Sequence, residues 1–257
     1  MSSANFVNLD TEQLKAYLQA RGEQDFVLID VRQPDEYSRL HIPGAQLIPF
    51  PLVEEEIPNL PQDKALIFTC RSGVRSRAAA TFVWETLGNS VTIFNHIGGI
   101  LSWDGRTLSG FPRARALGEL NDFTMVLTSG IDMEKGTWIL YNQVMERFPQ
   151  APFRDAFVSL SQAEESHALT LYNLLHKRDQ SVPDFDTMFA EAKGQVLEGG
   201  ATLQGEIDKL SRPESSDPFI LLEMALDIEY SAYDLYRHGA EKTHMRSLAT
   251  AFGSSPE

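Results

Sequence analysis

The chain of 257 residues is poor in cysteine and in long apolar runs. Its one cysteine, Cys70, excludes an intrachain disulfide. No run of about 18 apolar residues occurs, so we expect no membrane-spanning helix. The first residues lack a basic stretch followed by an apolar one, so we expect no secretory signal. A single thiol that must stay free suits a reducing compartment, and we therefore expect a cytoplasmic protein.

Positive charge is also scarce, and the imbalance is uneven along the chain. The net charge is −14. Residues 1–113 hold 10 basic and 13 acidic side chains, for −3, and the remainder holds 12 basic and 23 acidic ones, for −11. Nucleic acid is therefore excluded as an expected partner, because phosphate binding needs an excess of Lys and Arg. The length is sufficient for two domains of ordinary size.

Cys70 begins a polar loop that has the features of a reactive site. An apolar stretch, 65–68, precedes it, and a helix-forming stretch, 77–87, follows it. A strand, a small-residue loop and a helix start place the sulfur over backbone N–H groups, which favour an anion together with two arginines. The same field lowers the pKa of a thiol and gives a nucleophilic thiolate. The alternative is an inert buried cysteine, but core cysteines rarely lie between arginines in a glycine-containing loop.

Other segments accompany this loop in a fixed order. They are 28–32 (LIDVR), 35–37 (DEY), 41–45 (HIPGA), the pair Gly98 and Gly99, Trp103, and 110–112 (GFP). With these motifs, residues 5–113 resemble the rhodanese family. The resemblance implies a parallel-sheet α/β domain whose cysteine carries a persulfide between a sulfur donor and a thiol acceptor.

The length of the loop favours sulfur over phosphate as the bound group. Arg75 follows Cys70 by five residues, as in rhodanese sulfurtransferases, whereas the loop of related phosphatases is one residue longer. We expect Cys70, Arg75 and Arg71 to be catalytic, with Arg75 binding the donor and Arg71 at the mouth of the loop. The expected substrate-binding residues are Arg71, Ser72, Gly73, Val74, Arg75 and Ser76. Asp30, Arg32 and His41 are expected to have structural roles.

The second half of the chain repeats a pattern of possible metal ligands. Glu and Tyr recur seven residues apart, two helical turns, so both side chains share a helix face. Glu-x-x-His also occurs twice, and this spacing again places both side chains on one face. The expected ligands are Glu134, Glu164, His167, Glu229, Glu241 and His244, with Tyr141 and Tyr236 expected to be core aromatics.

This ordered set resembles the ferritin-like superfamily, in its rubrerythrin branch, over residues 118–250. The resemblance implies a four-helix bundle with a carboxylate-bridged di-iron site. Carboxylate and imidazole ligands suit iron or manganese. For each residue alone, a solvated glutamate or a surface histidine is the simpler interpretation. Glu165 is expected at the surface, because it points about 100° away from Glu164.

One spacing departs from this pattern. Glu229 precedes Glu241 by only 12 residues, so the last hairpin would need its turn at 237–239. The hairpin is truncated, is completed from another chain, or has lost a loop. Residues 184–210 are predicted to be a helical segment that contains Gly199 and Gly200. Within it, Glu198 and Glu206 are spare ligand candidates.

The sequence thus predicts a multidomain protein. Residues 1–113 form a rhodanese-like α/β domain, and residues 114–257 form an all-α ferritin-like bundle. We expect a sulfurtransferase coupled to a redox or oxidant-handling di-iron centre. A redox or iron sensor, and a metal-free bundle used for dimerisation, are the alternatives. The expected partners are a small sulfur donor, a thiol acceptor and a second copy of the chain. Electrons would come from an external donor, because no rubredoxin-type cysteine pair is present.

Overall fold

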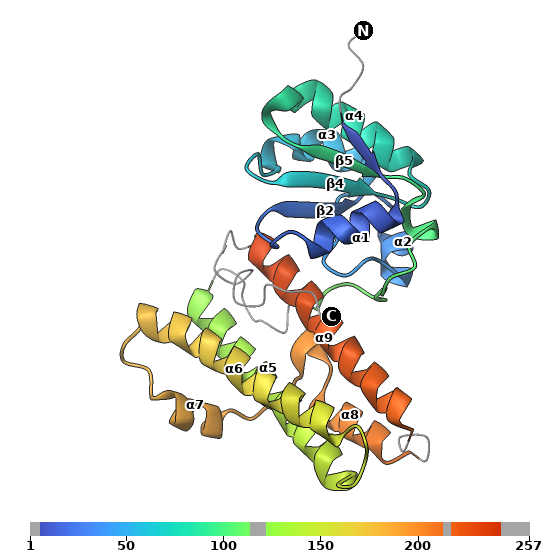
Figure 1. Cartoon of the computed structure of the whole chain (residues 1–257). Coiled ribbons are helices and arrows are strands. Elements are labelled where there is room, and N and C mark those ends of the chain that lie inside the picture. Colours follow the sequence, from blue (N-terminus) through green and yellow to red (C-terminus); the bar gives the residue numbers. More distant parts are fainter. Residues whose placement is uncertain (1–5, 114–121, 213–216, 243–257) are drawn as a thin grey trace. The chain divides into compact units, whose positions relative to one another are not determined.

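The computed structural model describes residues 6–113, 122–212 and 217–242 (Figure 1). The chain divides into two compact units, the first ending at Phe111 and the second beginning at Pro112. Each unit is described by itself below. In the described ranges, the helices are all too short or too polar to cross a membrane.

The first unit is built on a parallel sheet of five strands. The strands are β1 (Val7–Leu9), β2 (Phe26–Asp30), β3 (Gln46–Leu47), β4 (Ala65–Thr69) and β5 (Ile93–His96), in the spatial order β1-β5-β4-β2-β3. The helices are α1 (Thr11–Gln19), α2 (Pro34–Arg39), α3 (Val53–Glu56) and α4 (Val74–Leu87), with 3-10 turns η1 (Phe50–Leu52), η2 (Ile57–Asn59), η3 (Gly88–Ser90) and η4 (Gly99–Leu101). Strands β2 and β4 are buried at every position, as expected for a parallel sheet covered on both faces.

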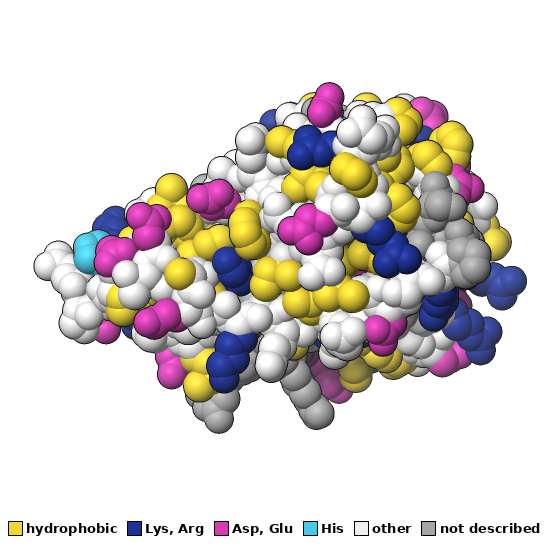
Figure 2. All heavy atoms as spheres, turned by 90° about the horizontal axis from the view of Figure 1, so that it is seen from below, with side chains coloured by type: hydrophobic (Ala, Val, Ile, Leu, Met, Phe, Trp, Pro, Cys, Tyr) yellow, Lys and Arg dark blue, Asp and Glu magenta, His cyan; other side chains and the backbone are white. Residues whose placement is uncertain are grey.

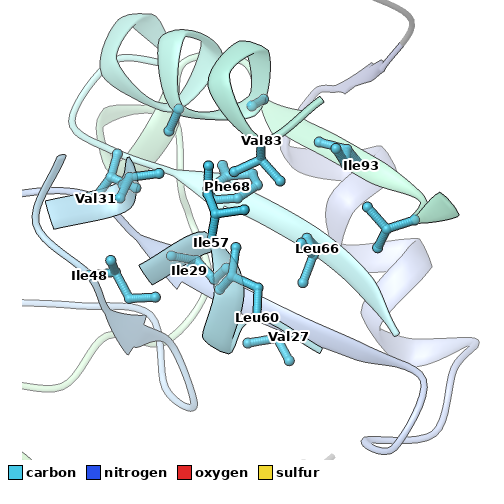
Figure 3. Close-up of a cluster of buried hydrophobic side chains, with 14 of the residues drawn as sticks. Val27, Ile29, Val31, Ile48, Ile57, Leu60, Leu66, Phe68, Val83 and Ile93 are labelled. Atoms are coloured by element: carbon cyan, nitrogen blue, oxygen red, sulfur yellow. The ribbon is translucent and has the colours of Figure 1, made fainter. Parts of the chain in front are cut away.

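Alternate residues of the central strands face opposite layers of helices. Val27 and Ile29 of β2 pack with residues of α3 and α4 in one cluster, which Figure 3 shows together with Phe68 and Val83. The intervening residues of β2, such as Leu28, pack on the other face with residues of α1 and α2. The sheet therefore lies between two helical layers, and its carboxyl edge is left for loops.

The second unit is helical. Its elements are α5 (Phe123–Arg147), α6 (Arg154–Arg178), α7 (Phe185–Glu191), η6 (Glu198–Gly200), α8 (Leu203–Leu210) and α9 (Pro218–Lys242). Helices α5 and α6 lie side by side (Figure 1). Two buried apolar clusters, one around Leu127 and one around Leu140, hold the helices together. Among the described residues three helices are 25 residues long, so the predicted four-helix bundle is not complete there.

The prediction of one helical segment over 184–210 is wrong in its middle. Helix α7 ends at Glu191, and the chain then follows α5 as an extended loop before α8 begins. Gly194, Gly199 and Gly200 have φ values of 58°, 74° and 81°, which an α-helix cannot accommodate. The Asp132 carboxylate on α5 accepts hydrogen bonds from the N–H groups of residues 193 and 194, at 2.8 and 3.1 Å, and fixes the loop there.

The predicted turn at 237–239 is also wrong. Helix α9 continues through this segment to Lys242, because one glycine inside a helix costs only about 1 kcal/mol. Twelve residues of helix separate Glu229 and Glu241 by about 18 Å along the axis. The two residues therefore do not meet at one site within the chain. The Glu241 side chain and all of His244 lie outside the described residues.

The acidic excess of the protein is dispersed on the face seen in Figure 2. There, acidic side chains lie scattered among basic and hydrophobic ones. On this face the charge therefore has the character of a solvated surface.

We predict that the first unit depends on Leu66, which is fully buried in β4. Leu66→Ala should lower the free energy of unfolding by about 3–5 kcal/mol, because it leaves a cavity in the core. Leu52→Ala, at a position that is 46% exposed, should change it by less than about 1 kcal/mol. Urea unfolding in a Trp138→Phe background measures this, since Trp84 and Trp103 then report on the first unit. Equal effects of the two variants would contradict the described packing.

Candidate functional site

Cys70 follows directly after β4, at the carboxyl edge of the sheet. The residue is 1% exposed. Its Sγ accepts a hydrogen bond from the Gly73 N–H at 3.1 Å and lies 3.4 Å from the Ser76 hydroxyl. Gly73, with φ of 88°, then starts α4, so the sulfur lies at the N-terminal end of a 14-residue helix. Strand, loop and helix thus surround the sulfur with donors, as the sequence predicts.

The loop is held from behind by η4. The Ile100 N–H donates to the Cys70 carbonyl at 2.8 Å, and the Leu101 N–H donates to the Arg71 carbonyl at 3.1 Å. Gly99 makes this approach possible, because a Cβ there would collide with the Cys70 carbonyl oxygen and the Arg71 backbone. With its carbonyls turned toward η4, the loop directs N–H groups toward the sulfur.

The surroundings of Cys70 favour a thiolate. Burial alone raises the pKa of the thiol. Hydrogen bonds from the Ser76 side chain and backbone, and from the backbone N–H groups of Ser72 and Gly73, outweigh burial, so the pKa lies below its ordinary value. Ionised cysteine is the nucleophilic form of the side chain.

A buried polar chain positions Ser76. Its hydroxyl donates to Asn95 Oδ1 at 2.7 Å, and Asn95 Nδ2 donates to Asn8 Oδ1 at 2.8 Å. A hydroxyl has one proton, so Ser76 can donate either to Asn95 or to the sulfur, but not to both. Ser76 can therefore follow the charge of Cys70 by turning its proton toward the thiolate.

The two expected donor-binding arginines differ in their surroundings. Arg71 is exposed. Arg75 makes a two-pronged ion pair with Glu36, with both N–O distances at 2.7 Å. The Arg75 guanidinium lowers the pKa of Glu36 to about 2, so this carboxylate is ionised at neutral pH. Sequence reasoning assigned Glu36 no role, since its partner lies 39 residues away.

The polar residues expected to be structural tie the loops of the first unit together. Arg32 pairs with Asp30, with the shortest N–O distance at 2.6 Å, and donates to the Leu40 carbonyl at 2.8 Å. His41 is buried and stacks on Tyr37. Burial lowers the pKa of His96 to about 4, so its ring is neutral between Thr11 and Thr69.

The second unit gathers a compact group of possible metal ligands. Glu134 on α5, Glu164 and His167 on α6, and Glu198 on η6 each offer a ligand atom, and these atoms all lie within 4.8 Å of one another. The three carboxylates are buried and His167 is partly exposed. Three of the six predicted ligands thus come together, and the spare candidate Glu198 joins them. The Glu198 N–H donates to Thr137 on α5 at 3.3 Å, which helps to fix the loop.

Glu229 lies beside this group, within a crossed pair of hydrogen bonds. Tyr236 on α9 donates to Glu134 on α5 at 3.0 Å. In turn, Tyr141 on α5 donates to Glu229 on α9 at 2.9 Å. Both tyrosines are buried, and burial raises the pKa of each well above its ordinary value. They are neutral core residues that fix two carboxylates.

The buried carboxylates of this group are stabilised only if a proton or a cation offsets their negative charge. Burial raises the pKa of Glu134 to about 7, although hydrogen bonds within the group act in the opposite direction. Burial and the neighbouring carboxylates raise the pKa values of Glu164 and Glu198 well above the ordinary value. Neither carboxylate oxygen of Glu164 accepts a hydrogen bond from a described polar donor. Shared protons or a bound cation would stabilise such a cluster.

The other acidic candidates lie elsewhere. Glu206 pairs with Lys209 on the same helix, at 2.7 Å. Glu165 is exposed, as expected. Near Cys70, the buried Asn95 was missed, because a single asparagine within a strand carries no distinctive sequence signal.

We predict that Ser76→Ala raises the pKa of the Cys70 thiol, because the variant removes the side-chain donor. Ser72→Ala should leave the pKa unchanged, since the contribution of this exposed residue comes from its backbone N–H. The rate of iodoacetamide alkylation against pH measures both values. A Ser76→Ala profile that coincides with that of the wild type would show that the backbone alone sets the pKa.

The first unit is similar in sequence to the rhodanese-like domain and to proteins that are named as sulfurtransferases. Residues 10–106 match the family profile of the rhodanese-like domain. The chain is 32% identical to the putative sulfurtransferase YtwF of Bacillus subtilis over 99 residues, 38% of this chain and 91% of that protein. It is 30% identical to a sulfurtransferase of Allochromatium vinosum, covering 37% of this chain and 85% of that protein.

Two further matches cover different shares of the compared proteins. The chain is 44% identical over 79 residues, 30% of its length, to the probable adenylyltransferase/sulfurtransferase MoeZ of Mycobacterium tuberculosis, and spans 19% of that protein. A rhodanese-like domain protein from Staphylococcus aureus, of known structure, is 26% identical with a TM-score of 0.35, covering 40% of this chain and 98% of that one. On the sequence matches, the chain belongs to the rhodanese-like family through residues 10–106.

Proposed function

We propose that the first unit is a sulfurtransferase that carries sulfane sulfur as a persulfide on Cys70. The observation that carries this proposal is the environment of the Cys70 sulfur, which has the Gly73 N–H and the Ser76 hydroxyl within hydrogen-bond distance. The names of the similar proteins support it, since three of them contain the word sulfurtransferase, one as putative and one as probable.

In the first half-reaction the Cys70 thiolate attacks the outer sulfur of the donor. A sulfur–sulfur bond forms to Cys70, the bond between that sulfur and the rest of the donor breaks, and the leaving group takes the electron pair. In the second half-reaction an acceptor thiolate attacks the outer sulfur of the persulfide, and Cys70 leaves as a thiolate. The loop N–H groups stabilise the anion in both states. No external oxidant or reductant is needed.

Positive charge at the mouth of the loop would assist an anionic donor. Arg71 is exposed there, whereas Arg75 shares its charge with Glu36. A small thiol acceptor would reach the persulfide at the same mouth of the loop. A small anionic sulfur donor and a thiol acceptor are therefore part of this proposal.

For the second unit we propose a metal centre. The buried carboxylates and the imidazole fit a hard cation, because the unsatisfied oxygens of Glu164 and the charges of Glu134 and Glu198 would be neutralised by it. Oxygen and imidazole ligands suit iron or manganese. In a di-iron centre Glu229 would be the further carboxylate ligand, and Tyr141 already orients it. Such a centre supplies redox chemistry when metal is bound, and electrons would come from an external donor.

The alternatives to a redox enzyme differ in what they require of this cluster. A sensor of iron or oxidant needs the same ligands but no turnover. A bundle that serves only for dimerisation needs no metal. Metal content therefore separates the third possibility from the first two.

We predict that Cys70 is the site of sulfur loading. Intact-mass analysis after treatment with thiosulfate should show one added sulfur atom on the wild type and none on Cys70→Ala. Cyanide should remove the added sulfur, since a persulfide is open to nucleophiles. The same added mass on both proteins would rule out Cys70 as the carrier.

We predict that the wild type binds about one or two metal ions per chain, as a carboxylate site in a helical unit requires. Glu164→Gln should weaken binding at least about tenfold, because it removes a charged ligand. Glu165→Gln makes the same chemical change at the exposed neighbour and should have no effect. Anaerobic equilibrium dialysis against ferrous iron or Mn²⁺, followed by elemental analysis, measures this. Wild-type protein that retains less than about one ion per two chains would leave the bundle a structural role.

A further inference from the structure

Glu36 forms an ion pair with Arg75 and is itself held in place at the start of α2. Its two oxygens accept from the two terminal nitrogens of Arg75, both at 2.7 Å. One of the oxygens also accepts from the Gln33 N–H at 3.1 Å, as part of the cap that begins α2. The side chains of Arg75 and Glu36 are only 32% and 26% exposed. A two-pronged, partly buried pair of this kind is stronger than an ordinary surface ion pair.

The positive charge available to a donor is therefore smaller than the sequence suggests. The loop 70–76 contains two arginines, but the charge of Arg75 is cancelled by Glu36. Arg77 lies beyond the loop, on α4, and Arg32 is cancelled by Asp30. In the described part of the first unit, Arg71 makes no ion pair and supplies one net positive charge to the mouth. One charge suits a donor with a single negative charge better than a dianion.

Three exposed apolar side chains border the loop. Val74, Ile97 and Leu101 are 74%, 51% and 67% exposed. All three adjoin the loop: Val74 belongs to it, the Leu101 N–H donates to Arg71, and the Ile97 Cα lies 3.3 Å from where a Cβ on Gly73 would be. An organic group on the donor would find apolar contact here, whereas an inorganic oxyanion would not.

We propose that Glu36 is a specificity-determining residue, which neutralises Arg75 and so makes the Cys70 loop prefer singly charged organic sulfane-sulfur donors over the thiosulfate dianion. The inference rests on the proposed sulfurtransferase function. A persulfide or a thiosulfonate belongs to this class of donor. With a thiosulfonate, Cys70 takes the outer sulfur and a sulfinate leaves with the electron pair, just as sulfite leaves from thiosulfate.

Two donors test the effect of charge with the same kind of leaving group. Thiosulfate carries two negative charges, and methanethiosulfonate carries one. The measurement is kcat/KM for persulfide formation on Cys70, by rapid quench and intact mass, on the full chain. In Glu36→Gln the ratio of thiosulfate to methanethiosulfonate should rise on the order of tenfold, because Arg75 then faces the donor unpaired. Benzenethiosulfonate should react faster than methanethiosulfonate in the wild type, through its apolar ring.

Asp35→Asn is the matched control. It removes the same charge one residue earlier, at a side chain that is 68% exposed and pairs with Arg39, and it should leave the ratio unchanged. The double variant Glu36→Gln, Arg75→Gln removes a neutral pair, so its ratio should stay near that of the wild type. This variant also covers the case in which Glu36→Gln alone perturbs folding.

The outcomes are distinct. A Glu36→Gln protein that slows equally with both donors would overturn the inference, since Glu36 would then only position Arg75. Loss of thiosulfate reactivity in the double variant would overturn it as well, because Arg75 would then bind the donor despite its partner. Absence of persulfide from every donor in the wild type would instead refute the proposed sulfurtransferase function.

Discussion

The peptide groups of the Cys70 loop are held from behind by η4, and the chemistry of the first unit depends on this contact. A peptide carbonyl and the N–H of the same bond point in opposite directions. When Ile100 and Leu101 bind the carbonyls of residues 70 and 71, the loop must direct donors toward the sulfur. Gly99 is required because a side chain there would displace the loop. The anion site is thus formed by strand order, since β5 adjoins β4 in the sheet.

The second unit is governed by a different constraint, which is the cost of placing carboxylates inside a helical core. Three buried glutamates and a histidine lie together, and two tyrosines on opposite helices fix Glu134 and Glu229. This arrangement raises the free energy of the folded protein unless a compensating charge is present, because burial disfavours the ionised carboxylate. Protons can supply that compensation, and so can a cation. The protonated form and the cation-bound form of the protein would differ in charge and in stability while keeping the same backbone fold.

Features that depend on consecutive residues could be predicted from the sequence, whereas contacts between segments far apart in the chain could not. The Cys70 loop was correctly placed between a strand and a helix because its strand, glycine and arginines are consecutive in the chain. The pairing of Arg75 with Glu36 could not be predicted, because it depends on how β2 and β4 align in the sheet. In the helical half, Glu198 was only a spare candidate. Its route into the core depends on left-handed glycines and on Asp132, which no helical periodicity reveals. The false turn at 237–239 came from fitting a full repeat to a helix that does not stop.

The crossed hydrogen bonds between α5 and α9 also fix how the two helices are placed along each other. Tyr236 reaches Glu134, and Tyr141 reaches Glu229, so the two helices run antiparallel and each presents the same two side chains to the other. Exchange of α5 and α9 by a twofold rotation leaves this pattern unchanged. A shift of α9 by one turn along α5 would break both hydrogen bonds at once, because each tyrosine would move about 5.4 Å from its carboxylate. The positions of both carboxylates therefore depend on a single register between the two helices.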